Sequence, residues 1–297
     1  MADPNDPNDP SGLDGPSSLS DRTELAGLTL PVCRTCGTQY AAPRPDCPVC
    51  LDERQYVRPD GQRWTSLAEL REEGHQGRFE EQGPGVLGIG CTPSFAIGQR
   101  ALLLRTPSGN VLWDCVPYLD DAMIEEVRAL GGISAIAVSH PHFYSAMVDW
   151  AHAFDAPVHL HEADRRWVAR PDPAIRFWNG RTHRLTDELT LINPGVHFPG
   201  STVMHDSTGE GALFSGDVVN VCPDRRWVSI MYSYANHIPE RPDAVRAAGE
   251  LLGGYRFERI YGAWWDGVVA ADGNGVLARS VERYLRFEQG RPAEAHS

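Results

Sequence analysis

The sequence predicts an α/β protein in which two packed sheets carry helices on their outer faces. From residue 84 onward, short apolar runs typical of strands alternate with amphipathic runs typical of helices, and the alternation fills two similar halves. In front of that region, four cysteines fall within a stretch too short to form a hydrophobic core. We therefore expect four parts in order: a disordered tail at 1–24, a metal-stabilised segment at 25–58, a linker at 59–83 and one large domain at 84–290.

The amino-acid composition of the chain argues against several classes of function. The chain has 297 residues, of which 41% are hydrophobic, and this is enough for one sizeable core. No apolar run approaches the length of a membrane span and no signal-peptide pattern is visible, so we expect a cytoplasmic protein without a membrane partner. A net charge of −13 argues against nucleic acid as a partner. All 27 basic residues are arginine, which excludes lysine Schiff-base chemistry.

Two segments lack a clear core pattern. Residues 1–24 are rich in Asp, Pro, Ser and Gly and have almost no apolar side chains to bury, so we expect a disordered tail. Residues 59–83 begin with a Pro-Asp-Gly turn and contain one short helical pattern at 66–73. We interpret this second stretch as a linker in front of the large domain.

The four clustered cysteines have the spacing of a metal site. Cys33 and Cys36 form one Cys-x-x-Cys pair. Cys47 and Cys50 form a second pair after ten intervening residues, and two such turns can present four thiolates to one ion. The segment resembles a zinc ribbon, and its Cys-Pro-x-Cys turn also resembles rubredoxin, so iron is an alternative. A closed four-thiolate site stabilises the fold without catalysis, and the ribbon offers a docking surface for a protein partner.

The large domain is expected to start with a hairpin. Apolar runs at 101–105 and 111–115 flank a turn-rich tetrad at 107–110. A helix capped by Asp120 or Asp121 follows and ends before a Gly-Gly pair. The remaining elements are expected as strands at 133–138, 157–161, 188–193, 201–205, 212–215 and 259–261, and as helices at 146–154, at 242–252 and after Val276.

The stretch at 139–145, Ser-His-Pro-His-Phe-Tyr-Ser, lies between a predicted strand and a predicted helix. His140 and His142 are therefore expected at the carboxyl end of a buried strand, where α/β sandwiches keep metals and ligands. This order of strand, His-x-His and helix resembles the first metal motif of the metallo-β-lactamase fold, whose usual form is His-x-His-x-Asp-His.

Three further stretches match the same family in the same order. A strand ends at Asp114, His197 lies in a Gly-x-His-x-x-Gly-Ser-Thr turn, and Asp217 ends a Ser-Gly-Asp turn. Together these motifs resemble a metallo-β-lactamase-fold hydrolase, which implies a four-layer αββα sandwich. By that resemblance, one metal is held by His140, His142 and His197. Asp217 lies adjacent as a further ligand, and Asp114 is a carboxylate behind the ligands.

The resemblance breaks at the second metal position. In two-metal members an Asp and a His stand where this chain has Tyr144 and Ser145, and the late His is missing from the stretch at 261–266. We therefore expect one metal in the cleft, which the ligand types indicate is zinc, with iron as the alternative. Trp264 and Trp265 are expected to fill the vacated space, either as a substrate wall or as core.

Two residues are candidates for the catalytic steps. Asp217 can accept the proton of an attacking water, and Tyr144 can donate a hydrogen bond to a developing oxyanion or, equally well, serve as a packing aromatic. The Arg-rich and aromatic segment at 221–237 is expected to form a substrate lid. Within it, Arg225 and Arg226 are candidates for binding a substrate carboxylate or phosphate, and the alternative is that both are solvated.

Three functions are compatible with these motifs. The first is a single-zinc hydrolase acting on an ester, thioester, lactone or similar small molecule. The second is a mononuclear iron oxygenase, because His140, His197 and Asp217 also form a two-His-one-carboxylate set, and persulfide dioxygenases of the same fold use equivalent positions. The third is a non-catalytic binding module.

Overall fold

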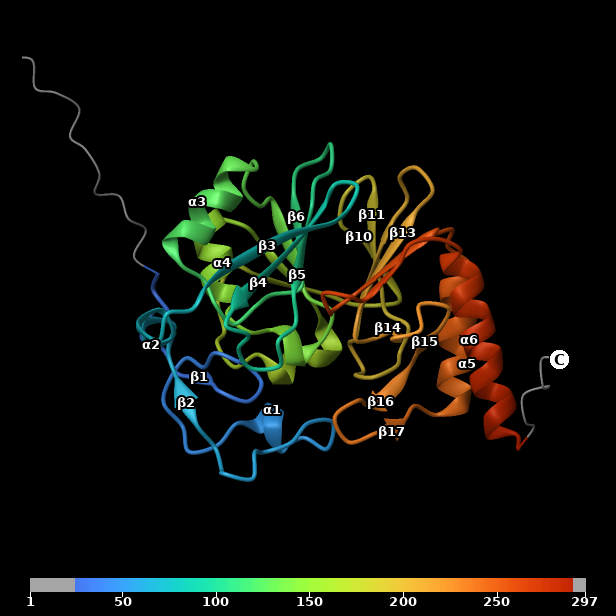
Figure 1. The fold of residues 1–297 in the computed structure, drawn as a ribbon, viewed down its shortest axis with the longest axis horizontal. Coiled ribbons are helices and arrows are strands. Elements are labelled where there is room, and N and C mark those ends of the chain that lie inside the picture. Colours follow the sequence, from blue (N-terminus) through green and yellow to red (C-terminus); the bar gives the residue numbers. More distant parts are fainter. Residues whose placement is uncertain (1–24, 291–297) are drawn as a thin grey trace, which may run out of the picture.

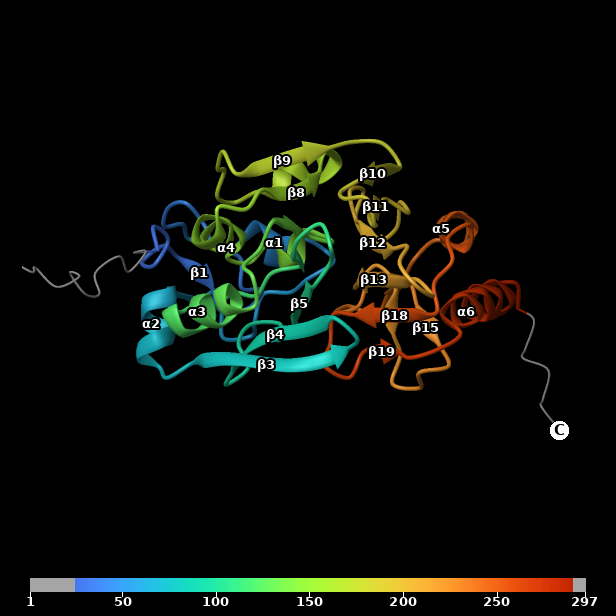
Figure 2. The same ribbon diagram turned by 90° about the horizontal axis from the view of Figure 1, so that it is seen from above.

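The computed structural model describes residues 25–290, so the tail expected at 1–24 lies outside the described residues. Two sheets lie face to face in the middle of the molecule, and helices cover both outer surfaces (Figures 1 and 2). None of the helices between residues 25 and 290 combines the length and the apolar character that a membrane span requires.

The first sheet has seven strands in sequential order. They are β3 (Gln76–Gly83), β4 (Val86–Thr92), β5 (Ala101–Leu104), β6 (Val111–Trp113), β7 (Ala135–Ala137), β8 (Val158–His161) and β9 (Ile175–Trp178). The strands from β3 to β6 pair antiparallel, and those from β6 to β9 pair parallel. The parallel part needs crossovers, and α3 (Asp121–Ala129) and α4 (Met147–Phe154) provide two of them on the outer face.

The second sheet has six strands in the order β10-β11-β12-β13-β18-β19. Their bounds are β10 (Thr182–Arg184), β11 (Leu189–Ile192), β12 (Val203–Asp206), β13 (Ala212–Gly216), β18 (Arg259–Gly262) and β19 (Val268–Val269). The one parallel pair, β13 with β18, is connected through α5 (Pro242–Gly253), and the chain ends in α6 (Gly273–Glu288). Figure 2 shows both of these helices on the outer side of this sheet.

Side chains of the central strands alternate between two apolar layers. In β5, Leu102 and Leu104 belong to the core between the sheets, whereas Leu103 packs in the core under α3 and α4. In β13, Phe214 belongs to the central core and Leu213 packs against α5 and α6. Burial on both faces explains why these strands are continuous apolar runs. The αββα sandwich expected from the sequence is confirmed.

Residues 59–83 differ from the linker expected there. They contain β2 (Trp64–Thr65), α2 (Leu67–Glu72) and β3, which pairs with β4 along the edge of the first sheet. The side chains of β3 are exposed or half-buried and include Arg78, Glu80 and Glu81. Charged side chains are common on edge strands because they discourage pairing with other molecules. Because of these charged residues, the sequence of β3 lacks the apolar pattern that predicts a strand.

The cysteine-rich segment packs against both halves of the sandwich. It contains β1 (Val32–Cys33) and α1 (Pro48–Leu51), and β1 pairs with β2. Its backbone contacts the first half through the Gln39 amide, which donates to the Ser145 carbonyl at 3.2 Å. Two small hairpins follow β13, namely β14 (Asn220–Val221) with β15 (Val228–Ser229), and β16 (Met231–Ser233) with β17 (Ile238–Pro239). The segment contacts the second of these hairpins, β16 with β17 (Figure 1).

A buried polar network joins this segment to α4. The carboxylate of Asp149 accepts hydrogen bonds from the Gly27 amide at 3.0 Å and from the Gln39 side chain at 2.7 Å. Arg170 lies 2.9 Å from the same carboxylate, and the side-chain exposure is 0% for Asp149 and 10% for Arg170. Two buried charges of opposite sign therefore satisfy each other and fix the N-terminal segment on the helix layer.

Replacing Asp149 by alanine is expected to lower the free energy of unfolding by about 3–5 kcal/mol, because the Arg170 guanidinium is left buried without its counter-charge. The matched control is Asp187→Ala, which removes an exposed partner of Arg184 and is expected to have little effect. Chemical denaturation measures both variants. Equal and small losses in the two would contradict this account of the network.

Candidate metal centre

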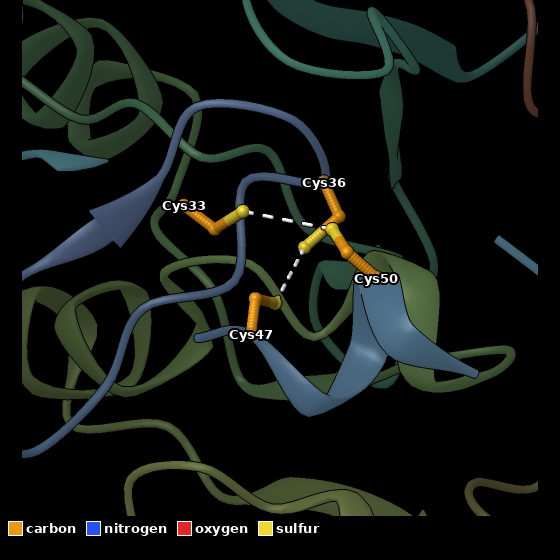
Figure 3. Close-up of side chains that lie close together, drawn as sticks. All are labelled: Cys33, Cys36, Cys47 and Cys50. Carbon is orange, nitrogen blue, oxygen red and sulfur yellow. Dashed lines mark hydrogen bonds between the residues drawn. The ribbon is translucent and has the colours of Figure 1, made fainter. Parts of the chain in front are cut away.

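Four buried cysteine sulfurs meet in the N-terminal segment. Figure 3 shows the side chains of Cys33, Cys36, Cys47 and Cys50 pointing toward one another, and the four sulfurs lie within 4.8 Å of one another. The Cys33–Cys50 and Cys36–Cys47 sulfur pairs are each 3.6 Å apart, far longer than a disulfide bond. Four sulfurs at about 2.3 Å from a tetrahedral zinc ion lie about 3.8 Å from one another, so the cluster fits one such ion.

Neighbouring groups can stabilise thiolates in this cluster. The Gln62 side-chain amide donates to the Cys33 sulfur at 3.3 Å, and the Tyr40 hydroxyl lies 3.2 Å from the Cys47 sulfur. Shared hydrogen bonding with the other cysteines, Cys36 first, lowers the pKa of Cys33, whereas burial raises the pKa of Cys36 and the hydrogen bond with Cys33 raises that of Cys50, so four thiolates require a bound cation. Metal ligands are commonly held by such outer hydrogen bonds, which orient them before the ion binds.

Three histidines form a second cluster at the ends of the strands. His140 and His142 lie at the turn Pro141–Phe143 after β7, and His197 lies in the loop between β11 and β12. One ring nitrogen from each lies within 4.8 Å of the others. The Nε2 atom of each ring is buried and has no hydrogen-bond partner within residues 25–290. Each such atom costs about 1–3 kcal/mol, and one shared cation satisfies all three.

Backbone carbonyls determine which nitrogen of His197 faces the cluster. Its Nδ1 atom lies 3.1 Å from the carbonyl oxygens of both Met231 and Tyr232. A carbonyl only accepts, so Nδ1 carries the proton and Nε2 keeps its lone pair. Burial lowers the pKa of His197 to about 4 and lowers the pKa values of His140 and His142 well below 6.5. The three rings are therefore neutral at pH 7, the form that binds a metal.

Asp114 supports the ligand His140 through Ser139. Its Oδ1 atom accepts the Ser139 amide at 2.7 Å, and the Ser139 hydroxyl shares a 2.9 Å hydrogen bond with Nδ1 of His140. A Cβ atom on Gly216 would lie 2.5 Å from that hydroxyl, so the arrangement requires glycine there. Asp114 therefore lies behind a ligand, as the resemblance implies. The sequence analysis did not single out Ser139, which immediately precedes the His motif.

Asp217 lies in the same cleft but outside the three-imidazole cluster. It lines the cleft with His142 and His197, yet it is not in the group whose ligand atoms all lie within 4.8 Å of one another. Its Oδ1 atom is buried without a partner in residues 25–290. Burial raises the pKa of Asp217 to about 7, and the nearby Trp264 indole partly opposes this rise. A carboxyl group with such a pKa can exchange a proton near neutral pH.

A cavity of about 300 Å³ opens beside the histidines, and two parts of the chain build it. The large domain contributes Ala96, Ile97, His142, His197, Asp217, Tyr234, Ala235 and Trp264. The N-terminal segment contributes Thr35, Arg54, Gln55 and Tyr56. The ribbon is therefore one wall of the cleft as well as a separate metal-binding unit.

Arg54 is the closest link between the ribbon and the metal cluster. Its Nε atom donates to the His197 carbonyl at 2.8 Å. Its guanidinium carbon lies 4.4 Å from the Phe198 ring centroid and 4.2 Å from the Tyr232 ring centroid, and Asp52 accepts from Nη1 at 2.8 Å. No sequence signal identified Arg54, because it lies outside the cysteine pattern and contacts a residue 143 positions away.

Of the three aromatic candidates, Trp264 alone lines the cleft, with its Nε1 atom donating to Asn220 at 3.1 Å. Tyr144 is 3% exposed and packs in the core between the first sheet and its helices, so its place fits the packing alternative and not an oxyanion role. Trp265 packs over β4, where a Cβ atom on Gly90 would lie 2.5 Å from its ring. Because glycine has no Cβ atom, the Trp265 indole fits against β4, outside the cleft.

The two arginines expected at the substrate do not line the cleft. Arg225 donates to the carbonyl of Cys222 within its own turn, and Arg226 is exposed and paired with Asp224 at 2.8 Å. The Cys222 amide donates to the Trp227 carbonyl at 3.1 Å, so this segment closes on itself. Among the described residues, Arg54 is the arginine that lines the cleft, in place of this pair.

Within residues 25–290, two groups of three or more His, Cys, Asp or Glu side chains come close enough to share an ion. These are the four cysteines and the three histidines. At the position where two-metal relatives have a second histidine ligand, the Ser145 hydroxyl accepts a hydrogen bond from the Gln99 amide at 3.1 Å. The Ser145 hydroxyl is thus already hydrogen-bonded to another part of the protein.

Comparison with known proteins agrees with this geometry. Residues 96–264 match the family model for the metallo-beta-lactamase superfamily. A protein of Bacillus subtilis (strain 168), described as uncharacterized protein YmaE, is 44% identical over 262 residues, which cover 86% of this chain and 95% of that protein. The alignment of 262 residues is longer than the part of this chain that runs from residue 96, where the family match begins, to the last residue. The alignment therefore extends into the N-terminal segment.

Solved structures share the fold at low sequence identity. The metallo-beta-lactamase DIM-1 covers 70% of this chain and 96% of its own, with a TM-score of 0.54 and 15% identity. The metallo-beta-lactamase FIM-1 from Pseudomonas aeruginosa, solved in a mono-zinc form, covers 73% of this chain and 97% of its own, with a TM-score of 0.51 and 14% identity. The motifs, the sandwich and the family match together show that this chain belongs to the metallo-β-lactamase superfamily.

Proposed function

We propose that the protein is a hydrolase that uses a single cleft cation, zinc by its ligand types, to activate water against an ester, thioester or lactone-like small molecule. The observation that supports this most directly is the set of three neutral imidazoles whose Nε2 atoms converge without partners. Three neutral protein ligands leave a fourth position open to water, which is typical of catalytic rather than structural zinc sites.

The number of ions in the cleft follows from the residues beside the first site. Tyr144 packs in the core, and Ser145 is hydrogen-bonded to Gln99. Neither side chain is an ordinary ligand for a hard dication. A second ion would therefore have Asp217 as its one clear protein ligand, which supports a mononuclear centre.

The chemistry divides between the cation and the chain. A divalent cation in such a site supplies Lewis acidity and lowers the pKa of water at its open position to roughly 7. The Ser139 hydroxyl and two backbone carbonyls hold His140 and His197 in position before substrate binds. The unpartnered Oδ1 atom of Asp217 is available to accept a proton within the same cavity. Trp264 closes one side and limits the entry of water.

The size of the cavity supports a small-molecule substrate. Its volume of about 300 Å³ is in the range of sites for small ligands. The lining combines apolar side chains such as Ile97 and Trp264 with a few polar groups. This mixture is typical of a site that binds an organic substrate and orients one reactive bond.

The two alternative functions have less support. An iron oxygenase requires His140, His197 and Asp217 around one ion, whereas the structure groups His142 with the other two histidines and leaves Asp217 outside that group. A binding module without cleft metal would leave three buried nitrogen atoms unsatisfied. Three imidazoles around one cation account for both observations.

Elemental analysis of anaerobically purified protein is expected to give about two zinc ions per chain, one for each cluster. His142→Ala is expected to lose the cleft ion and ester hydrolysis but to keep the ribbon ion, because two imidazoles bind zinc far more weakly than three. The control is His152→Ala, whose ring pairs with Asp172 at the surface. One zinc with one iron would support the oxygenase instead, and ribbon zinc alone would support the binding module.

Asp217→Asn is expected to lower kcat for p-nitrophenyl acetate by about 10²–10⁴-fold, because the amide cannot accept a proton. The carboxylate is the active form, so wild-type activity should rise as pH increases through the pKa of Asp217. Burial raises that pKa to about 7, and a bound cation lowers it from there, so the rise should lie at or below pH 7.

The variant should lose the part of the rise that comes from Asp217 and keep the part that comes from ionisation of the water at the open position, whose pKa is roughly 7. Metal content measured on the same sample separates a proton acceptor, which leaves the cation in place, from a metal ligand. An unchanged pH profile in the variant contradicts the proposed role of Asp217.

A further inference from the structure

The part of the ribbon that faces the cleft carries a positively charged side chain, and the other described residues that line the cleft include no Arg or Lys. We call the residues Thr35, Arg54, Gln55 and Tyr56 the ribbon wall. Arg54 is the one arginine among the described residues that line the cavity, in a chain whose net charge is −13. Asp52 is its counter-charge, at 2.8 Å from Nη1, so what Arg54 can offer to a ligand is its remaining N–H donors.

The guanidinium of Arg54 is held rigidly and keeps unused donors. Its Nε atom donates to the His197 carbonyl, its Nη1 atom donates to Asp52, and its plane lies between the Phe198 and Tyr232 rings. No hydrogen bond to a residue in the range 25–290 uses its Nη2 atom. A fixed guanidinium with free N–H groups loses little entropy when it binds an oxyanion.

The backbone of the ribbon wall is fixed by hydrogen bonds from the β16–β17 hairpin. The Asn236 side-chain amide donates to the carbonyls of both Glu53 and Gln55 at 2.9 Å. The Ser233 hydroxyl donates to the Arg54 carbonyl at 3.0 Å. These three bonds place two consecutive polar side chains of the wall at a defined position beside the cavity.

Gln55 gives a second indication of a ligand. The residue is 8% exposed, and its Oε1 atom is buried without a hydrogen-bond partner in the described part of the chain. An unsatisfied buried amide is costly, and buried polar groups normally find partners. No hydrogen bond within residues 25–290 uses the Gln55 Nε2 amide either, so this group can donate to an oxyanion beside Arg54, while Oε1 accepts from an N–H or O–H group of the same ligand.

We propose that the ribbon wall is a substrate-binding subsite and that the substrate carries an anionic group, a carboxylate or a phosphate, which Arg54 and Gln55 bind. This inference rests on the proposed hydrolase function. It extends that function by naming the class of substrate: a small anionic ester, thioester or lactone. Because the Arg54 side chain contacts the backbone of His197, the anionic group lies within the same cavity as the reacting bond.

Binding measured by titration calorimetry on the metal-loaded protein tests the subsite without turnover. Succinate is the carboxylate probe, succinamide its neutral counterpart, and inorganic phosphate the phosphate probe. We expect succinate or phosphate to bind at least about 10-fold more tightly than succinamide, and Arg54→Gln to remove about 10- to 100-fold of that affinity. The probe whose affinity falls in Arg54→Gln shows whether the subsite binds a carboxylate or a phosphate.

The control is Arg184→Gln, an exposed arginine that pairs with Asp187 and should leave all three affinities unchanged. An anion bound by the cleft cation alone would keep its affinity in Arg54→Gln, and this result would overturn the proposal. Metal content is measured on the same sample, because Arg54 also contacts a ligand loop. If Arg54→Gln loses the cleft metal, the variant Gln55→Leu is measured instead. A loss of about 3- to 10-fold in its affinity for the anion supports the subsite, and an unchanged affinity overturns it.

A second measurement separates this proposal from the function on which it rests. Turnover of p-nitrophenyl acetate is compared with turnover of its anionic analogue, mono-(p-nitrophenyl) succinate. If both esters are hydrolysed with the same kcat/KM in wild type and in Arg54→Gln, the hydrolase stands and the subsite fails. If neither ester is hydrolysed but succinate binding depends on Arg54, the subsite stands and the hydrolase fails.

Discussion

The functional centre depends on three buried imidazole nitrogens that have no hydrogen-bond partner within residues 25–290. The Nε2 atoms of His140, His142 and His197 come from two loops far apart in the sequence, and burial keeps all three rings neutral. Neutral rings that converge in this way are unfavourable unless a cation binds them. The sandwich fold supplies the loops, and hydrogen bonds at the Nδ1 atoms of His140 and His197 orient these two rings.

The two metal-binding clusters are structurally connected. The four cysteines organise the ribbon, the chain leaves the last of them at Cys50, and Arg54 then reaches the carbonyl of the ligand His197. The buried ion pair of Asp149 and Arg170 fixes the other end of the ribbon on α4. An ion in the ribbon therefore has an indirect effect on the cleft, because it positions the wall that faces the second ion. Under the proposed function, this arrangement places a structural metal next to a catalytic one without sharing a ligand.

The sequence was sufficient to predict the sandwich, both clusters and the supporting role of Asp114. The cysteine cluster follows from the spacing of its two Cys-x-x-Cys pairs, and the three-histidine cluster and the place of Asp114 follow from the resemblance of their motifs to those of the metallo-β-lactamase fold. The sequence was not sufficient to predict the ribbon wall. Arg54 and Gln55 reach the cleft through docking of the ribbon on the 233–236 loop, a contact between distant segments that has no periodic pattern.

The same distinction explains the residues that were misplaced. Tyr144 follows the metal motif directly, but its ring packs into the core, so proximity in sequence did not give proximity to the cleft. Arg225 and Arg226 have the right chemistry for an anion, but their turn binds its own backbone and a neighbouring acid. The edge strand β3 was missed because its charged side chains resemble those of a linker.

The central claim is that one cation binds among three imidazoles while a separate ion binds among four thiolates. Anomalous diffraction from crystals of the purified protein, recorded on both sides of the zinc absorption edge, tests it most directly. The account predicts two peaks per chain, one surrounded by the sulfurs of the ribbon and one within bonding distance of the three Nε2 atoms. A pair of peaks about 3.5–4 Å apart in the cleft, which is the spacing of a two-metal site, or no peak at the histidines, would contradict it.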